Sequence, residues 1–177
     1  SVPVAVGVTG APECEHDGLN QAIDTLPAYR RRIRRENEDN KKLPVIFNDY
    51  MNCLWGHPTE EEEYPLIDAA AKAGCEYFCI DAGWYADGDW WDSVGEWKES
   101  RKRFPNGVRK VTDYIRSKGM IPGVWLEMEV MGIYCDLAKE FPDEYFFVRH
   151  GKRVYDRSRY QLDYRNPEVR EYADSVI

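Results

Sequence analysis

The stretch Tyr77-Phe78-Cys79-Ile80-Asp81-Ala82-Gly83-Trp84-Tyr85 decides the fold of this chain. Its first four residues form an apolar run, rich in aromatic and β-branched side chains, which predicts a short strand buried on both faces. Strands of this kind belong to parallel sheets covered by helices, in which functional groups lie just beyond the carboxyl ends of the strands. Asp81 and Trp84 occupy that position and are therefore candidate ligand-binding residues.

Asp81 and Trp84 are a pair of side chains that suits a sugar. A carboxylate accepts hydrogen bonds from hydroxyl groups, while an aromatic ring packs on the apolar C–H face of the sugar. The structural alternative is an aspartate that caps a strand and a tryptophan that fills the core. This stretch alone favours neither interpretation.

Composition limits the class of protein. The chain has 177 residues, about one domain's worth, and 43% of them are hydrophobic, so a sizeable core is expected. The net charge of -8 argues against a nucleic-acid surface. The basic run at 30–35 is followed by Glu36, Glu38 and Asp39, and we interpret it as the solvated face of a helix. No apolar segment is long enough to cross a bilayer.

The cysteines and histidines give no sign of a disulfide framework or a metal site. The five cysteines are scattered, and Cys75 and Cys79 would lie roughly 13 Å apart along a strand, too far for a disulfide. Reduced thiols and the lack of a signal-peptide pattern favour a cytoplasmic protein. The three histidines show no ligand spacing, so no metal or other cofactor is expected.

Strands and helices are predicted to alternate along most of the chain. Strands are expected at 44–50, 77–80, 121–127 and 160–163, and helices at 59–73, 108–118 and from 167 onward. This alternation is the signature of an α/β fold with a parallel sheet, and four such units make about the first half of a (β/α)8 barrel of the TIM type. The last helix reaches Ile177 without a stop signal, so we expect a barrel truncated at its C-terminal end.

The region before the first strand is predicted to be separate from the barrel. Residues 1–42 comprise a linker and a lead-in helix at 19–40, in which Pro27 should start, kink or interrupt the helix. Residues 43–177 are expected to form the N-terminal part of the barrel domain. The long connection at 86–106 contains three tryptophans and is expected to be ordered and functional.

Local signals mark the ends of two helices. Thr59 can cap the helix at 59–73, and Gly74 can close it in a left-handed conformation. Pro65 is awkward unless the regular helix starts near it. Asn166 is expected to cap the last helix, with Pro167 at its first position.

Glu127 and Glu129 are two residues apart at the end of the predicted third strand, so both carboxylates would point to one face, roughly 7 Å apart. That separation suits an inverting glycosidase pair. Two exposed glutamates at a strand end are the structural alternative, and a divalent-metal pair is a further one that lacks additional ligands.

Polar residues recur at the carboxyl end of every predicted strand. They are Asn48 and Asp49, then Asp81, then Glu127, and finally Arg157, Arg159 and Asp163. Aspartate and asparagine favour turns by themselves, but arginine does not. The recurrence therefore favours a polar pocket on the C-terminal face of the barrel.

Five segments carry ordered motifs that resemble one known family. The segments are Asn48-Asp49-Tyr50 with Thr59-Glu60-Glu61, Ile80-Asp81-Ala82-Gly83-Trp84, Ser93-Val94-Gly95-Glu96-Trp97 with Arg103-Phe104-Pro105-Asn106-Gly107, Gly123-Val124-Trp125-Leu126-Glu127-Met128-Glu129, and Gln161-Leu162-Asp163 with Asn166-Pro167-Glu168-Val169-Arg170. They resemble the catalytic domain of glycoside hydrolase family 36, the α-galactosidase family with retaining (β/α)8 barrels. The resemblance runs from Leu43 to Ile177.

The resemblance implies a sugar pocket by position. Asp81, Trp97 and an arginine of the fourth strand would hold the terminal sugar, with Arg159 preferred to Arg157. Asp49 and Tyr50 would line the same pocket. Glu127 and Glu129 would then belong to the pocket floor rather than to the catalytic pair.

The sequence also departs from the family pattern. Ala82 stands where the family has the second aspartate of Asp-Asp-Gly-Trp, which puts galactose specificity in question. The family's nucleophile lies in a Lys-x-Asp-x-Asn motif, and its acid/base aspartate follows later; this chain contains neither motif, so it holds no expected catalytic residue. We therefore expect a fragment of a retaining exo-α-glycosidase, most plausibly an α-galactosidase acting on oligosaccharides. A galactosyl transferase of the same fold and a non-catalytic carbohydrate-binding protein are the alternatives. The fragment is expected to be inactive and to self-associate through uncovered apolar faces.

Overall fold

The computed structural model describes residues 18–177 and divides the chain into two units, one that ends at Leu43 and one from Pro44 to Ile177. The linker expected at the N-terminus, together with Cys14 and His16, lies outside the described residues. No helix in the described part of the chain is long and apolar enough to span a membrane.

The unit that ends at Leu43 contains two helices, α1 Gly18–Ile33 and α2 Glu38–Lys42, so the single helix predicted at 19–40 is wrong. A second start signal explains the break, because the Asn37 side chain accepts a hydrogen bond from the Asn40 N–H at 2.7 Å. Pro27 lies inside α1 without ending it. It removes the hydrogen bond to the Ile23 carbonyl, and Ile23 is exposed, so water can satisfy that carbonyl.

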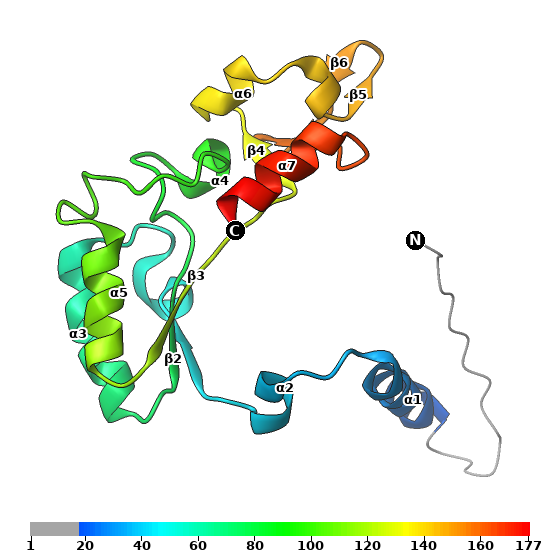
Figure 1. The fold of residues 1–177 in the computed structure, drawn as a ribbon. Coiled ribbons are helices and arrows are strands. Elements are labelled where there is room, and N and C mark those ends of the chain that lie inside the picture. Colours follow the sequence, from blue (N-terminus) through cyan, green and yellow to red (C-terminus); the bar gives the residue numbers. More distant parts are fainter. Residues whose placement is uncertain (1–17) are drawn as a thin grey trace. The chain divides into compact units, whose positions relative to one another are not determined.

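A three-stranded parallel sheet organises the second unit (Figure 1). Its order is β1 Ile46–Asn48, β2 Tyr77–Ile80 and β3 Ile121–Val124. The connections carry α3 Glu60–Lys72 and α5 Val108–Ser117, which lie side by side on one face of the sheet. The β-α-β-α-β part of the predicted fold is therefore confirmed, and the described residues form three parallel strands rather than a complete barrel.

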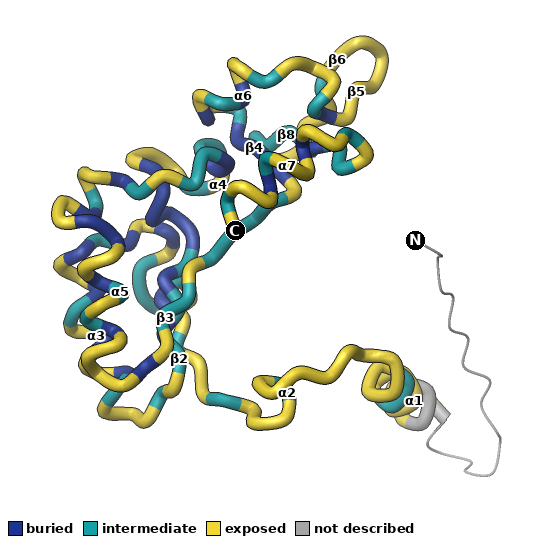
Figure 2. Tube along the Cα trace, in the orientation of Figure 1, coloured by how far each residue is buried: buried dark blue, intermediate teal, exposed yellow. Residues whose placement is uncertain are grey.

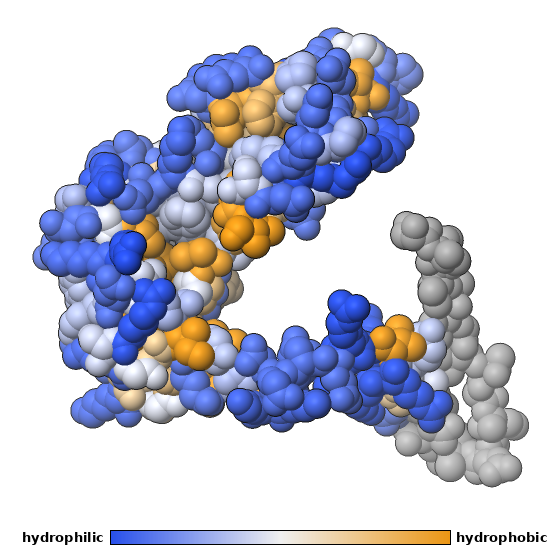
Figure 3. Space-filling model, viewed as in Figure 1, coloured by the Kyte–Doolittle hydropathy of each residue, from blue (hydrophilic) through white to orange (hydrophobic). Residues whose placement is uncertain are grey.

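Strand β2 is buried on one face only, which corrects the prediction of burial on both. Phe78 and Ile80 are fully buried, whereas Tyr77 and Cys79 on the opposite face are half-buried. Figure 2 shows the buried positions concentrated where α3 and α5 meet the sheet. Apolar side chains also reach the surface along the strands (Figure 3); the exposed ones are Val45, Ile46, Ile121 and Val124.

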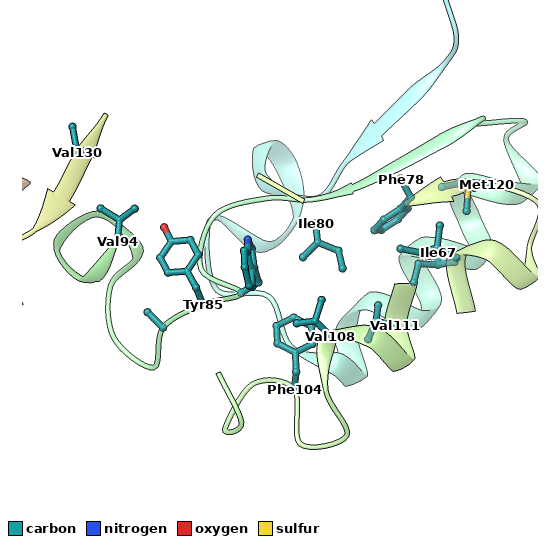
Figure 4. Packing of buried hydrophobic residues seen from close by; sticks show 14 residues of the cluster. Ile67, Phe78, Ile80, Tyr85, Val94, Phe104, Val108, Val111, Met120 and Val130 are labelled. Atoms are coloured by element: carbon teal, nitrogen blue, oxygen red, sulfur yellow. The ribbon is translucent and has the colours of Figure 1, made fainter. Parts of the chain in front are cut away.

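The main core fills the space between the sheet and its two helices. Phe78 and Ile80 point from β2 towards Ile67 of α3 and Val111 of α5 (Figure 4). Burying side chains of this size removes apolar surface from water and contributes about 1.5–3 kcal/mol for each fully buried residue. This packing holds the carboxyl ends of β1, β2 and β3 next to one another.

The ends of α3 follow the predicted signals. The Thr59 hydroxyl accepts the Glu62 N–H at 3.3 Å, which caps the helix, and donates to the Glu62 carboxylate at 2.6 Å. Gly74 follows the helix with φ 84°. Pro65 lies within the helix rather than near its start. The carbonyl that it leaves without a donor belongs to Glu61, which is exposed to water.

The connection at 86–106 is packed rather than loose. It contains the short helix α4 Trp90–Ser93, and its Val94 and Phe104 are fully buried. Asp49 leads into a short π-helical segment, Tyr50–Leu54. The cysteines of the described residues, Cys53, Cys75, Cys79 and Cys135, form no disulfide.

An antiparallel layer follows β3 and corrects the prediction of a fourth parallel strand. The order in this sheet is β4 Val130–Gly132, β8 Arg159–Gln161 and β7 Tyr155–Asp156. Between β4 and β7 in the chain lie α6 Asp136–Glu140, a 3-10 turn at Asp143–Tyr145 and a hairpin of β5 Val148–Arg149 and β6 Lys152–Arg153. Met131, Phe146, Leu162 and Val169 form a second small core. Helix α7 Pro167–Val176 packs on this core and begins at Asn166 as predicted.

Candidate functional site

Asp81 is fixed from two sides at the end of β2. Its carboxylate accepts a hydrogen bond from the Asn48 side-chain amide at 2.5 Å, and its backbone N–H donates to Asp49 Oδ1 at 2.7 Å. The Ala82 N–H donates to the second carboxylate oxygen at 2.7 Å. Because Asn48 ends β1 and Asp81 follows β2, parallel pairing of the two strands brings these groups together. The result is a half-buried carboxylate with one orientation.

Asp49 and Glu63 lie beneath Asp81 and are fully buried. Burial raises the pKa of Asp49, while hydrogen bonding to Glu63 and to the Asp81 N–H opposes that shift. For Glu63, burial and the neighbouring Asp49 raise the pKa to about 10. Asp49 thus supports the site from below and does not face a ligand, in contrast to its expected place in the pocket lining.

Trp90 of α4 connects the sheet end with the antiparallel layer. Its ring lies 5.9 Å from the Tyr50 ring and 5.5 Å from the Trp125 ring, both edge-on, and the Arg159 guanidinium lies 5.6 Å from its centroid. Gly56 permits this approach, because a Cβ at that position would lie 2.3 Å from the Trp90 ring. Trp90 was not among the predicted site residues, although its place in a tryptophan-rich connection was a usable signal.

Arg159 and Glu127 form a partly buried ion pair at 2.6 Å. Arg159 begins β8 of the antiparallel layer, not a fourth barrel strand. Arg157 is exposed in the preceding turn with φ 48°. Both arginines line a hollow of about 310 Å³ together with Trp90, Trp91 and Ser158. The preference for Arg159 over Arg157 thus has a geometric basis, since only Arg159 is held by an ion pair with Glu127.

Glu127 and Glu129 do not form the carboxylate pair that their spacing suggested. Strand β3 ends at Val124, so Glu127 lies in irregular backbone and Glu129 in the following turn, and strand alternation applies to neither. Glu127 is engaged by Arg159, whereas Glu129 is exposed and lines a different hollow with Tyr164 and Ile177. No group of three or more potential metal ligands occurs among residues 18–177.

The tryptophans predicted to contact sugar occupy different environments. Trp84 is only 8% exposed, and its indole N–H donates to the Trp125 carbonyl at 3.0 Å. Its ring is therefore mainly core, and the structural alternative for this residue describes it better. Trp97 is half-buried and packs edge-on against Tyr85 with ring centroids 4.9 Å apart.

The Tyr85 hydroxyl lies within the electrostatic influence of both Asp81 and the Glu127–Arg159 ion pair. Burial raises the pKa of its hydroxyl, the charges of Glu127 and Asp81 raise it further, and Arg159 opposes them. Asp81, Glu127 and Arg159 therefore act on one buried ring. The structure thus brings together Asp81, Tyr50, Trp97, Glu127 and Arg159 around a cluster of tryptophans, with Asp49 and Trp84 as supports. It adds Trp90, Trp125 and Glu63, and Glu63 carried no signal because it ends a run of four glutamates.

The sequence profile of the melibiase family matches residues 8–177, and the chain belongs to that family, which corresponds to glycoside hydrolase family 36. The resemblance inferred from the motifs is confirmed.

Individual relatives agree with this assignment. The chain is 32% identical over 154 residues to α-galactosidase Mel36A of Lactobacillus acidophilus, covering 86% of this chain and 21% of the relative. Its fold is similar to that of α-galactosidase AgaB of Geobacillus stearothermophilus, with a TM-score of 0.74 at 27% identity, covering 90% of this chain and 22% of that one. A variant of AgaA from the same organism, in complex with raffinose, gives 0.75 at 25% identity with the same coverage. The chain therefore spans about a fifth of the length of the curated relatives it matches.

Proposed function

We propose that this chain forms one wall of the sugar pocket of a retaining exo-α-glycosidase, with terminal α-linked galactose as its substrate. The observation that carries the proposal is the fixed carboxylate of Asp81, held by Asn48 and Asp49 at the carboxyl end of a parallel sheet. A carboxylate whose orientation is set before binding loses little entropy when it accepts hydrogen bonds from sugar hydroxyls. Raffinose, bound by the AgaA variant, is an oligosaccharide of the proposed class.

The remaining groups fit the same role. Arg159 supplies donors to ring or hydroxyl oxygens, and Glu127 sets the direction of its guanidinium. Trp90, Trp97 and Trp125 offer aromatic surface that can pack on the apolar face of a sugar. The hollow beside Trp90 and Arg159 is the described space into which a second sugar unit would extend.

Ala82 leaves the identity of the bound sugar to be tested by experiment. Its side chain is 1% exposed and offers no hydrogen-bond acceptor where the family pattern has an aspartate. Asp81 alone then carries the hydroxyl recognition of this segment. Galactose stays the preferred sugar on the strength of the relatives, and another α-linked sugar is the alternative that Ala82 favours.

The chemistry itself needs two further carboxylates. Retaining hydrolysis requires one carboxylate to attack the anomeric carbon and another to protonate the leaving oxygen. Glu127 is paired with Arg159, and Glu129 faces elsewhere, so neither matches that arrangement. The chain by itself is accordingly expected to hydrolyse nothing.

The test is hydrolysis of a panel of aryl α-glycosides by the product of the complete reading frame that contains this sequence, with this chain assayed alongside. We expect turnover of the α-galactoside by the complete product alone. Asp81→Asn in that product should lower kcat/KM by about 10- to 100-fold, the cost of weakening a charged hydrogen bond. Asp113→Asn, on the exposed side of α5, is the matched control and should change nothing.

Other outcomes point elsewhere. Turnover of a different α-glycoside would indicate that Ala82 has changed the sugar specificity. Transfer of galactosyl units to a sugar acceptor, in place of hydrolysis, would favour the transferase. Sugar binding without turnover would favour a carbohydrate-binding protein, and turnover by this chain alone would overturn the proposal.

A further inference from the structure

Glu63 is a buried acid that the sugar pocket itself does not use. It lies on the inner face of α3, its side chain is fully buried, and neither carboxyl oxygen meets a hydrogen-bond donor among the described residues. Asp49 Oδ2 is in the same situation. Three buried acceptor atoms without donors are costly, because each forfeits its bonds to water without replacement.

The groups that act on Glu63 are acids from every neighbouring element. They are Asp49 at the end of β1, Glu62 on α3 and Cys53 in the π-helical segment, and Cys79 of β2 and Asp81 beyond it belong to the same cluster. Among the described residues, the main influences on the pKa values of Asp49 and Glu63 are burial, hydrogen bonds and acidic neighbours, and they include no lysine, arginine or histidine. Ionising both Glu63 and Asp49 would place two uncompensated negative charges in a low-dielectric interior.

One added proton supplies a hydrogen-bond donor between the buried oxygens of Glu63 and Asp49. Two carboxylates are acceptors only, whereas a protonated carboxyl is a donor as well. With a proton on Glu63, its O–H can donate to the free oxygen of Asp49. The other oxygen of Asp49 already accepts the Asp81 N–H at 2.7 Å, so the proton completes a chain from α3 through Asp49 to Asp81.

We propose that Glu63 and Asp49 form an acid pair that holds one proton between them, and that this pair positions Asp81. The functional meaning of that position rests on the proposed role of Asp81 in sugar binding. Glu63 contacts no substrate and acts only through Asp49, so it is a positioning residue.

The pair has a defined pH dependence. The pKa of Glu63 rises from its ordinary 4.5 to about 10 in the folded chain. The stability linked to this proton is therefore fully present below pH 4.5, falls as the pH rises above it, and is lost once the pH passes about 10. Within that window unfolding releases one proton, so the unfolding equilibrium constant grows by about tenfold per pH unit from this pair.

The first experiment looks for the proton directly. Infrared spectroscopy of the chain at pH 7 should show the C=O stretch of a protonated carboxyl, which ionised carboxylates lack. Glu63→Gln and Glu63→Leu should both remove that band, so either variant suffices if the other does not fold. Glu61→Gln, on the exposed side of the same helix, should keep it. Absence of the band at pH 7, or its persistence in the Glu63 variants, would overturn the acid pair.

The second experiment follows the position of Asp81. In a chain labelled with 15N-aspartate, the Asp81 amide signal is identified by its loss in Asp81→Asn. Glutamine keeps an N–H donor towards Asp49 and should leave that signal in place, whereas leucine removes the donor and should displace it. An unmoved signal in Glu63→Leu, or equal displacement in both variants, would refute the positioning role. Neither experiment uses a substrate, so failure of the glycosidase assay would count against the proposed function alone.

Discussion

Asp81 and Glu63 differ in how far their roles could be predicted from the local sequence. Asp81 was a candidate from sequence because it directly follows a predicted buried strand, although the turn preference of aspartate explained it equally well. Glu63 belongs to a run of four glutamates at a helix start, where the helix dipole explains acids without any burial. Only the register of α3 against the sheet turns Glu63 inward, and a local pattern carries no information about that register. Burial of Trp84 was one of the two interpretations that the sequence left open, and the local pattern could not decide between them for the same reason.

Cys79 should be a slow thiol. Burial and the nearby Asp81, Asp49 and Glu63 raise the pKa of Cys79 to about 11, two units above an ordinary cysteine at 9.0. At pH 8 its thiolate fraction, and with it the alkylation rate, should be about 100-fold lower than for an unperturbed thiol. Iodoacetamide labelling followed by mass spectrometry measures this rate. Asp81→Asn removes a negative neighbour and should speed the reaction, and labelling of Cys79 at the rate of a free peptide thiol would contradict the prediction.

Glu127→Gln should destabilise the second unit. The change leaves the Arg159 guanidinium, 17% exposed at its side chain, without its charged partner. Exposed ion pairs contribute little to the free energy of unfolding, whereas breaking a buried pair costs several kcal/mol. For this partly buried pair we expect the free energy of unfolding to fall by about 1–3 kcal/mol. Urea unfolding monitored by tryptophan fluorescence gives this difference. Glu129→Gln, an exposed glutamate two residues away, is the control, and equal effects of both changes would exclude a special role for the ion pair.

At the scale of elements, sequence patterns identified strands but not their neighbours. The strand at 77–80 and the helices α3 and α5 were predicted because apolar periodicity and capping residues are local. The segment at 160–163 was correctly expected to be extended, yet it pairs antiparallel with β4 and β7. Strand pairing depends on residues some thirty positions away, and a β-strand pattern does not encode its direction. The same limit explains why β3 ends three residues early.

Thr59→Ala should weaken the start of α3 and thereby the support of the site. The hydroxyl satisfies the Glu62 N–H, and its loss should lower the free energy of unfolding by about 1 kcal/mol. Thr112→Ala in α5 is the matched control, since its hydroxyl bonds only within its own helix, donating to the Arg109 carbonyl and accepting from the exposed Arg116 side chain, and caps no helix end. Chemical denaturation of both variants makes the comparison. A loss in Thr112→Ala as large as in Thr59→Ala would show that capping is not the cause.

At the scale of the whole molecule, the second unit is an open sheet. The sequence predicted an incomplete parallel barrel, and its three parallel strands with their crossover helices are present, while the pocket residues named from the sequence stay predictions. The number of parallel strands was overestimated, because β8 and α7 of the antiparallel layer have the sequence spacing of a further parallel strand and its helix. One face of the β1–β2–β3 sheet is covered by helices, and the other leaves the paired residues Ile46 and Ile121 exposed on either side of Tyr77.

This exposed face should make the chain self-associate. Contiguous exposed apolar side chains on a sheet with two open edges favour pairing with a second chain. On size-exclusion chromatography we expect elution ahead of the 20.7 kDa monomer, increasingly so at higher concentration. Ile46→Lys places a charge on the edge strand and should shift the equilibrium towards monomer. A sharp monomer peak at all concentrations would contradict this expectation.

The one-sided cover of the sheet also bears on the order of folding. Each parallel strand pairs with the next one along the chain, Ile46 with Tyr77 and Tyr77 with Ile121, and each crossover helix packs on the strands that it joins. Such a layer can assemble stepwise during translation, since every pairing is complete as soon as the next strand leaves the ribosome. The carboxylate of Asp81 is then already oriented while later parts of the polypeptide are still being made. The sheet that carries Asp81 would then serve as a template for the later parts. Mutations that slow the formation of α3 should first lower the yield of soluble protein.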